Sequence, residues 1–156
     1  MSSKRLKEGD PAPDFTAYDQ NGDRIALSDF KGKKLVLYFY PKDLTPGCTA
    51  EACDLADHYR SLLDHGFEVV GVSPDIGEQH RKFIDKHELP FDLIADPDMD
   101  LIQKYGAYGE KTVMGQKKEG VLRHTFLIDE EGKIEKVFRK VRTKDHANQI
   151  LEAVAA

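Results

Sequence analysis

Residues 38–53 read YFYPKDLTPGCTAEAC, and this stretch contains both cysteines of the chain, Cys48 and Cys53. The apolar run that ends at Tyr40 predicts a buried strand, and the prolines and glycine that follow predict a loop. A helical pattern begins after this loop, so Cys48 is expected at the N-terminus of a helix. Unpaired backbone N–H groups and the helix dipole favour a thiolate at that position. Cys48 is therefore a candidate reactive thiol.

The length and composition indicate a single domain that covers residues 1–156, with 40% hydrophobic and 33% charged residues. The net charge is −5 and no long run of Lys and Arg occurs, which argues against a nucleic-acid-binding surface. The longest apolar run has six residues, too few for a membrane span, and the charged N-terminus lacks the apolar core of a signal peptide. We expect a cytoplasmic protein that binds neither nucleic acid nor membranes.

Two cysteines in a cytoplasmic protein fit a redox or catalytic use better than a framework of structural disulfides. The alternative is that both are buried and serve only as small apolar residues. A metal site is not favoured, because Cys48, Cys53 and His58 follow one another at five-residue spacings and spread around a helix. The other histidines stand among charged residues and are expected to be solvated: His65, His80, His87, His124 and His146. We expect no metal and no cofactor.

Strand and helix patterns alternate along the rest of the chain. A β-hairpin is expected over 14–27 around an Asn-Gly turn. The further expected strands are 34–40, 67–72, 91–95, 123–129 and 133–139, and the expected helices are 49–64, 73–87, a short one after 98, and a last one capped by Thr143. Residues 106–120 show no period and contain four glycines, which predicts a surface loop. This order is that of an α/β thioredoxin-like fold with an N-terminal β-hairpin extension, in which helices flank a central sheet.

The helical pattern places the two cysteines on different faces of the expected helix. Cys48 belongs to an apolar stripe, and Cys53 falls on the polar face with Asp57. The stripe continues through Ala52, Leu55, Ala56, Tyr59, Leu62 and Leu63. Five residues of regular helix separate two Cα atoms by about 8–9 Å, whereas a disulfide requires about 4.4–6.8 Å. A Cys48–Cys53 disulfide therefore requires local unwinding of the helix.

A reactive thiolate also needs hydrogen-bond donors and a nearby cation. Thr45, three residues before Cys48, can place its hydroxyl beside the sulfur, and Pro41 stiffens the loop. Arg123 is the best candidate for the cation, because its neighbours in a strand pattern suggest an inward-facing position, where it needs an anionic partner. The alternative is an arginine that snorkels to solvent at a strand end.

Residues 41–48 match the peroxiredoxin signature Pro-x-x-x-Thr-x-x-Cys. Extended to Cys53, the stretch resembles the subfamily of bacterioferritin-comigratory proteins, also called peroxiredoxin Q. The likeness covers nearly the full chain and includes the segments 9–15, 70–73 and 125–129. The resemblance implies a thiol peroxidase that acts on hydrogen peroxide and organic hydroperoxides.

The resemblance also implies a role for each residue of the site. Cys48 would attack the peroxide, Pro41 would shield it, and Cys53 would resolve the oxidised sulfur in an intrachain disulfide. The residues expected to hold the peroxide are Thr45, Gly47, Cys48 and Arg123. Thioredoxin or a similar dithiol would reduce the disulfide, and an intrachain resolving cysteine favours a monomer.

Two interpretations stay open from the sequence. Glu51, in the first turn of the helix, either places Arg123 or only complements the helix dipole. A thioredoxin-like binding module or thiol sensor, whose disulfide changes a partner surface, would use the same unwinding as an enzyme.

Overall fold

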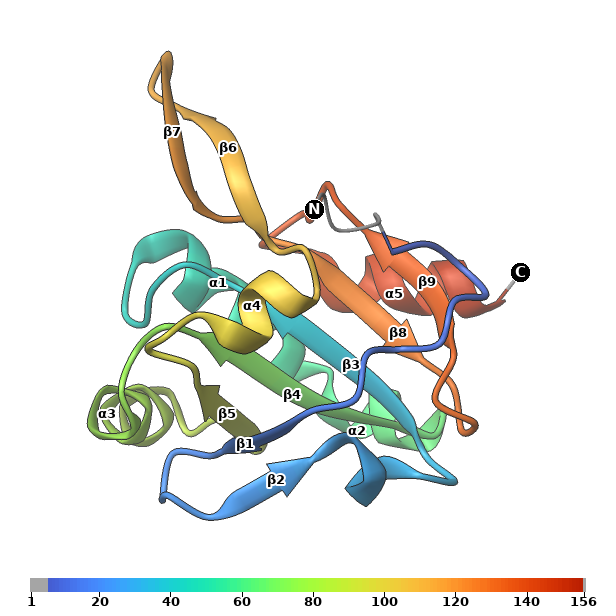
Figure 1. The fold of residues 1–156 in the computed structure, drawn as a ribbon. Helices are drawn as coiled ribbons and strands as arrows, with labels where there is room; N and C mark the ends of the chain where they lie inside the picture. Colours follow the sequence, from blue (N-terminus) through green and yellow to red (C-terminus); the bar gives the residue numbers. More distant parts are fainter. Residues whose placement is uncertain (1–5, 156) are drawn as a thin grey trace.

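The computed structural model describes residues 6–155 and contains a central sheet with helices packed on both faces (Figure 1). Seven strands form this sheet in the order β2-β1-β5-β4-β3-β8-β9. Their bounds are β1 Thr16–Tyr18, β2 Arg24–Ala26, β3 Lys34–Phe39, β4 Phe67–Ser73, β5 Asp92–Ala95, β8 Thr125–Ile128 and β9 Ile134–Phe138. The three central strands β3, β4 and β5 are parallel, and the outer strands are antiparallel to their neighbours.

The central strand β3 is buried on both faces, as the apolar run predicts. Leu35, Leu37 and Phe39 belong to one hydrophobic cluster, and Val36 and Tyr38 belong to the other. Successive side chains of a strand point to opposite faces, so a strand with helices on both sides must be apolar at every position. The loop after Tyr40 therefore lies at the C-terminal end of the parallel strands β3, β4 and β5.

Helices cover the two faces unequally. The helix α4 (Asp100–Lys104) packs on the first cluster through Leu101 and Ile102. The helices on the second cluster are α1 (Pro46–Asp57), α2 (Tyr59–Asp64), α3 (Gly77–His87) and α5 (His146–Ala155). A short 3-10 helix, Leu27–Phe30, follows β2. A central sheet with helices on both faces and an N-terminal β-hairpin, β1–β2, is what the sequence predicts, so the expected fold class is confirmed.

The expected helix over 49–64 is divided into two segments. It begins earlier, at Pro46, and α1 is separated from α2 at His58, whose ring Nδ1 contacts the carbonyl of Asp54 at 2.9 Å. Such side-chain contacts with the backbone compete with the regular helical ladder. The apolar stripe is also shorter than expected, because Leu62 is buried whereas Leu63 is 36% exposed.

The prediction of a surface loop over 106–120 was wrong. Strands β6 (Tyr108–Val113) and β7 (Gln116–Val121) pair there in a separate antiparallel hairpin that extends away from the central sheet (Figure 1). Met114 and Gly115 form its turn with φ values of 52° and 79°, as a tight hairpin turn requires. Most residues of β7 are exposed. No alternation of apolar and polar residues therefore marks these strands in the sequence.

Two other helix starts differ from the expectation. The turn at Ser73 and Asp75 precedes α3, which begins only at Gly77. The helix α5 begins at His146, after a turn in which the Asp145 N–H donates to the Arg142 carbonyl at 3.0 Å. Thr143 therefore lies outside the helix and does not cap it. No helix among residues 6–155 is both long enough and apolar enough to cross a membrane.

Candidate active site

The first turn of α1 holds Cys48 in the interior, with its side chain 1% exposed and its thiol free. The first intrahelical bond runs from the Thr49 N–H to the Thr45 carbonyl at 2.8 Å. The N–H groups of Gly47 and Cys48 precede that bond, so they have no acceptor inside the helix. They point toward the space before the helix, where an incoming oxygen atom would be stabilised.

Arg123 lies between β7 and β8, far from Cys48 in the sequence, and its guanidinium contacts the sulfur of Cys48. Its Nη1 lies 3.5 Å from Sγ of Cys48 and 2.8 Å from Oε1 of Glu51. Burial would lower the pKa of Arg123, but the charges of Cys48 and Glu51 outweigh it and raise that pKa. A Cβ at Gly47 would lie only 3.3 Å from Nη2 of Arg123, so a glycine there leaves room for the guanidinium. The structure thus places Arg123 against Cys48 with an anionic partner, but it does so from the loop before β8, because the expected strand over 123–129 begins only at Thr125.

Glu51 is fully buried and connects α1 to Arg123. Burial raises the pKa of Glu51 from 4.5 to about 7, and the attraction of Arg123 opposes that shift. Its second oxygen, Oε2, has no hydrogen-bond partner among the residues that the structure describes. A carboxylate held away from water is costly unless it is paired. Of the two interpretations of Glu51, this contact supports the placement of Arg123.

Thr45 and Pro41 border the site from the loop before α1. The Thr45 hydroxyl donates to the Lys42 carbonyl at 2.8 Å, which closes the loop directly before the helix. Its action on the sulfur of Cys48 stays a prediction. Pro41 is half-buried and lines a cavity together with Arg123.

Cys53 lies five residues beyond Cys48, about one and a half helical turns, on the other face of α1. It is partly exposed and its thiol is free. Burial, and then the charge of Asp57, raise the pKa of the Cys53 thiol. Cys53 is therefore mostly protonated at neutral pH, and the unbroken helix 46–57 keeps it away from Cys48.

The expectation that His146 is solvated was wrong, because this residue is fully buried behind Glu51. Its Nδ1 contacts the amide oxygen of Gln149 at 2.9 Å, and its Nε2 contacts the hydroxyl of Thr125 at 2.9 Å. An amide oxygen can only accept, so Nδ1 carries the proton and Nε2 accepts from Thr125. Burial lowers the pKa of His146 to about 4, so the ring is neutral near pH 7.

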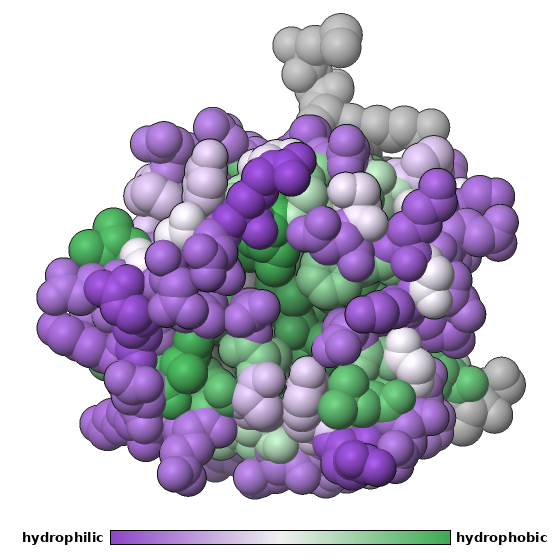
Figure 2. Space-filling view, turned by 90° about the horizontal axis from the view of Figure 1, so that it is seen from below, coloured by the Kyte–Doolittle hydropathy of each residue, from purple (hydrophilic) through white to green (hydrophobic). Residues whose placement is uncertain are grey.

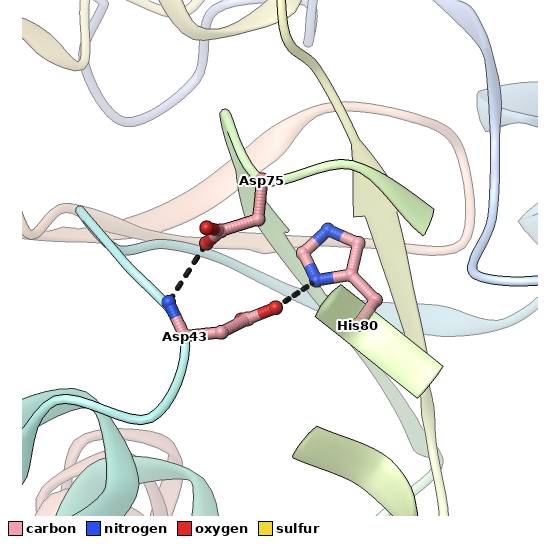
Figure 3. Close-up of side chains that lie close together, drawn as sticks. All are labelled: Asp43, Asp75 and His80. Atoms are coloured by element: carbon pink, nitrogen blue, oxygen red, sulfur yellow. Dashed lines mark hydrogen bonds and ion pairs between the residues drawn. The ribbon is translucent and has the colours of Figure 1, made fainter. Parts of the chain in front are cut away.

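His80 is also fully buried, contrary to the expectation, and belongs to a cluster with Asp43 and Asp75 (Figure 3). Nδ1 of His80 lies 2.6 Å from Oδ2 of Asp43, and Nε2 lies 2.9 Å from the carbonyl of Ile94. Two ligands of one zinc ion lie roughly 3.3 Å apart, since each bond is about 2.0–2.2 Å in a tetrahedral site. The 2.6 Å separation and the occupied ring nitrogens identify a hydrogen-bonded pair instead of a metal site.

The His80 cluster anchors the loop before α1. The Asp43 N–H donates to Asp75 at 2.7 Å, and the Tyr40 hydroxyl donates to Asp43 at 2.5 Å. The sequence contains one signal for this burial, because His80 shares a helix face with Phe83 and His87 at spacings of three and seven residues. That signal does not reveal the partner carboxylate in the loop.

A hollow with a partly apolar lining lies at the opposite end of β3 from Cys48. It has a volume of about 260 Å³ and is lined in part by Ala12, Leu27, Phe30 and Ile128. The view of Figure 2 shows a mostly hydrophilic face with hydrophobic residues gathered in a central hollow. Because it lies at the start of β3, this hollow takes no part in the site at Cys48.

Known proteins resemble this chain along nearly its whole length. Residues 8–137 match the AhpC/TSA family. Peroxiredoxin Bcp of Bacillus subtilis is 45% identical over 149 residues, which cover 96% of this chain and 95% of that protein. A cysteine variant of PrxQ from Xylella fastidiosa superposes with a TM-score of 0.90 at 29% identity and covers 98% of both chains. A bacterioferritin comigratory protein of Xanthomonas campestris, with alkyl peroxide reduction activity, has a TM-score of 0.83, 33% identity and 90% coverage of both chains.

These likenesses agree with the site at the start of α1, where the signature cysteine meets an arginine from a distant part of the chain. The chain belongs to the AhpC/TSA family and is a peroxiredoxin of the Bcp/PrxQ type.

Proposed function

We propose that this peroxiredoxin reduces hydrogen peroxide and organic hydroperoxides with Cys48 as the attacking group. The observation that carries the proposal is the contact of the Cys48 sulfur with Nη1 of Arg123 at 3.5 Å, in the first turn of α1. The cation and the unpaired N–H groups both favour a thiolate at this position. The alkyl peroxide reduction by the related Xanthomonas campestris protein supports the choice of substrate.

In the first step the thiolate of Cys48 attacks the terminal oxygen of the hydroperoxide and the O–O bond breaks. The sulfur becomes a sulfenic acid, and the other oxygen leaves with the electron pair and takes a proton to form an alcohol or water. Negative charge moves from sulfur to the leaving oxygen in the transition state. Arg123 and the N–H groups of Gly47 and Cys48 are the donors that would stabilise it, and the Thr45 hydroxyl would join them by turning away from the Lys42 carbonyl.

In the second step the thiol of Cys53 attacks the sulfenic sulfur, a disulfide forms and water leaves. This step requires α1 to unwind between the two cysteines, because a regular helix keeps their Cα atoms about 8–9 Å apart. A dithiol such as thioredoxin then exchanges with the disulfide and restores both thiols. The proposal includes a cytoplasmic location. It also includes a monomer, since the proposed resolving cysteine is on the same chain as Cys48.

Peroxide-dependent oxidation of NADPH, coupled through thioredoxin and thioredoxin reductase, tests the proposal. The wild type should turn over many equivalents of peroxide, and Cys48→Ser should show no turnover. Cys53→Ser should consume about one equivalent of peroxide and then stop with thioredoxin as the only reductant. Turnover by Cys48→Ser would refute the role of Cys48. Oxidation of the wild type once, without turnover, would instead indicate a thiol sensor.

A further inference from the structure

A cavity of about 310 Å³ lies beside the site and has a basic lining. Arg123 and Pro41 line it, so it adjoins the surroundings of Cys48. Its other ionisable lining residues are Lys111, His124 and Arg139. No Asp or Glu lines this cavity within the part of the chain that the structure describes, so its charges are of one sign.

Lys111 enters this cavity from the β6–β7 hairpin. Its strand partner is Lys118, and its side chain lies over Gly120, where a Cβ would come within 3.1 Å of Cε of Lys111. The Lys111 amine donates to the Val121 carbonyl at 3.0 Å, which directs it toward the body of the protein. The glycine at position 120 leaves room for this lysine side chain, which a Cβ would displace slightly.

The amine of Lys111 forms no ion pair with the residues that the structure describes. Within residues 6–155, no carboxylate lies at ion-pair distance from its amine, whereas the nearby Lys117 pairs with Glu110 at 3.9 Å. Burial lowers the pKa of Lys111 and the charge of Arg123 lowers it further, while Cys48 acts in the opposite direction. Arg123 already satisfies Glu51 at 2.8 Å. An additional anion in the cavity would be attracted by both cations.

We propose that this cavity binds a carboxylate carried by an organic hydroperoxide, and that Lys111 is the residue that determines this specificity. The inference rests on the proposed peroxidase function and names a class of its substrates. A carboxylate accepts charge-assisted hydrogen bonds from lysine and arginine. A substrate that places this group beside Lys111 is held next to Arg123, whose Nη1 lies 3.5 Å from the sulfur of Cys48, so its hydroperoxide is brought toward that sulfur. The volume of the cavity suits a short acid.

The test compares a short hydroperoxyalkanoic acid with its methyl ester, which has the same chain and hydroperoxide but no charge. The measured quantity is the ratio of kcat/KM for the acid to kcat/KM for the ester. We expect the wild type to prefer the acid, and Lys111→Met to lower the ratio about tenfold, the effect of one charge-assisted hydrogen bond. Added salt should lower the ratio of the wild type, because Lys111 is partly exposed.

Lys117→Met is the matched control. It removes the same charge from the same hairpin, but Lys117 is 76% exposed and does not line the cavity, so the ratio should stay at the wild-type value. Gly120→Ala keeps the charge of Lys111 but crowds its Cε, so its ratio should lie between those of the wild type and Lys111→Met.

A ratio of one in the wild type, or equal ratios in the wild type and Lys111→Met, would overturn the carboxylate site. Equal losses in Lys111→Met and Lys117→Met would also overturn it, since they would reflect only the net charge of the hairpin. These outcomes differ from failure of the proposed function, in which the wild type reduces neither the acid nor the ester.

Discussion

Arg123 joins Cys48 and Glu51 in the site, because one nitrogen contacts both side chains. A cation that touched only the sulfur could turn toward solvent, since its side chain is 24% exposed. The bond to Glu51 at 2.8 Å restrains that motion. In the proposed mechanism Glu51 is therefore a positioning residue, and the donors that would act on peroxide are those of Arg123 and the helix N-terminus.

Replacing Arg123 tests this at the residue scale. Arg123→Ala should lower kcat/KM for hydrogen peroxide by about 10²-fold or more, because one donor to the transition state is lost. Arg123→Lys should recover part of that loss, since the positive charge returns without the planar fork. Stopped-flow measurement of peroxide consumption gives these values. Arg142→Ala is the matched control, because Arg142 is 55% exposed and remote from Cys48. An unchanged rate in Arg123→Ala would make this arginine structural.

Glu51 should impose a pH dependence on stability. Its pKa is about 7 in the folded chain against 4.5 for the free carboxyl. Well below pH 4.5 Glu51 is protonated in both the folded and the unfolded chain and has no effect on the free energy of unfolding. Between pH 4.5 and 7 the carboxyl is ionised in the unfolded chain but still protonated in the folded one, and above pH 7 the folded chain must ionise a buried group. The free energy of unfolding should therefore fall by roughly 3 kcal/mol relative to Glu51→Gln across this range. Chemical denaturation of both proteins at about pH 5 and about pH 8 gives the difference. Parallel pH profiles would contradict the prediction.

His146 changes the free energy of unfolding with pH in the opposite direction. Its pKa is about 4 in the folded chain against 6.5 for the free ring, so the unfolded chain binds the proton first and stability falls as pH decreases from 6.5 toward 4. His146 is present in Glu51→Gln as well, but its Nε2 lies 3.9 Å from Oε2 of Glu51, so the comparison reports the ionisation of Glu51 together with its effect on His146. Without that comparison the two slopes would partly cancel between pH 4.5 and 6.5.

At the scale of elements, the proposed mechanism requires α1 to be both a rigid support for Cys48 and a segment that can unwind. Its N-terminal side is held by the Asp43–His80 pair, and its C-terminal side is held where Asp54 accepts the Ala147 N–H of α5 at 2.7 Å. Cys53 directly precedes Asp54. The unwinding that the disulfide requires is therefore expected between these two attachments, over residues 48–53.

Hydrogen exchange of the amides of α1 tests this expectation. In the reduced protein these amides should be protected, and in the disulfide form those of residues 49–54 should exchange at least tenfold faster, because their helical bonds are lost. Peroxide-treated Cys53→Ser cannot form the disulfide and should keep the protection of the reduced form. A disulfide form whose protection over residues 48–53 equals that of the reduced protein would contradict the unwinding.

The Asp43–His80 pair should contribute strongly to stability. His80→Ala removes the donor to a fully buried carboxylate, which typically costs about 3–5 kcal/mol of the free energy of unfolding. His65→Ala changes an exposed histidine and should have little effect. Urea denaturation measures both variants. A loss below about 1 kcal/mol in His80→Ala would show that the loop is held by other contacts.

At the scale of the whole molecule, residues far apart in the chain assemble the site. Cys48 and Glu51 come from α1, Arg123 lies between the hairpin and β8, and His146 begins α5. Cys53, the proposed resolving cysteine, is on the same helix as Cys48, so the proposed disulfide would need no second chain. The hairpin β6–β7 stands apart from the central sheet but places Lys111 beside Arg123.

The protein is accordingly expected to be a monomer in both redox states. Light scattering coupled to gel filtration should give a mass close to 17.6 kDa for the reduced form and for the disulfide form. The physical reason is that the disulfide forms within one chain. A mass of twice this value that disappears on reduction would indicate an intermolecular disulfide instead.

The sequence by itself determined the central strands, the loop and helix start at Cys48, and the separation of the two cysteines on the helix. These features depend on local periodicity and on the steric rules of proline and glycine. Both act between residues that are near one another in the chain. The resemblance of the signature added the peroxiredoxin family, which the comparisons with known proteins confirm.

Only the tertiary structure decided which polar residues are buried. His80 and His146 look solvated among their charged neighbours in the sequence, yet each is fully enclosed because a partner from a distant segment, Asp43 or Thr125, satisfies its ring. The hairpin over 108–121 was likewise hidden, because strands exposed on both faces carry no alternation. Periodicity reports which face of an element is apolar, whereas the burial of a polar group depends on hydrogen-bond partners that only the folded chain brings together.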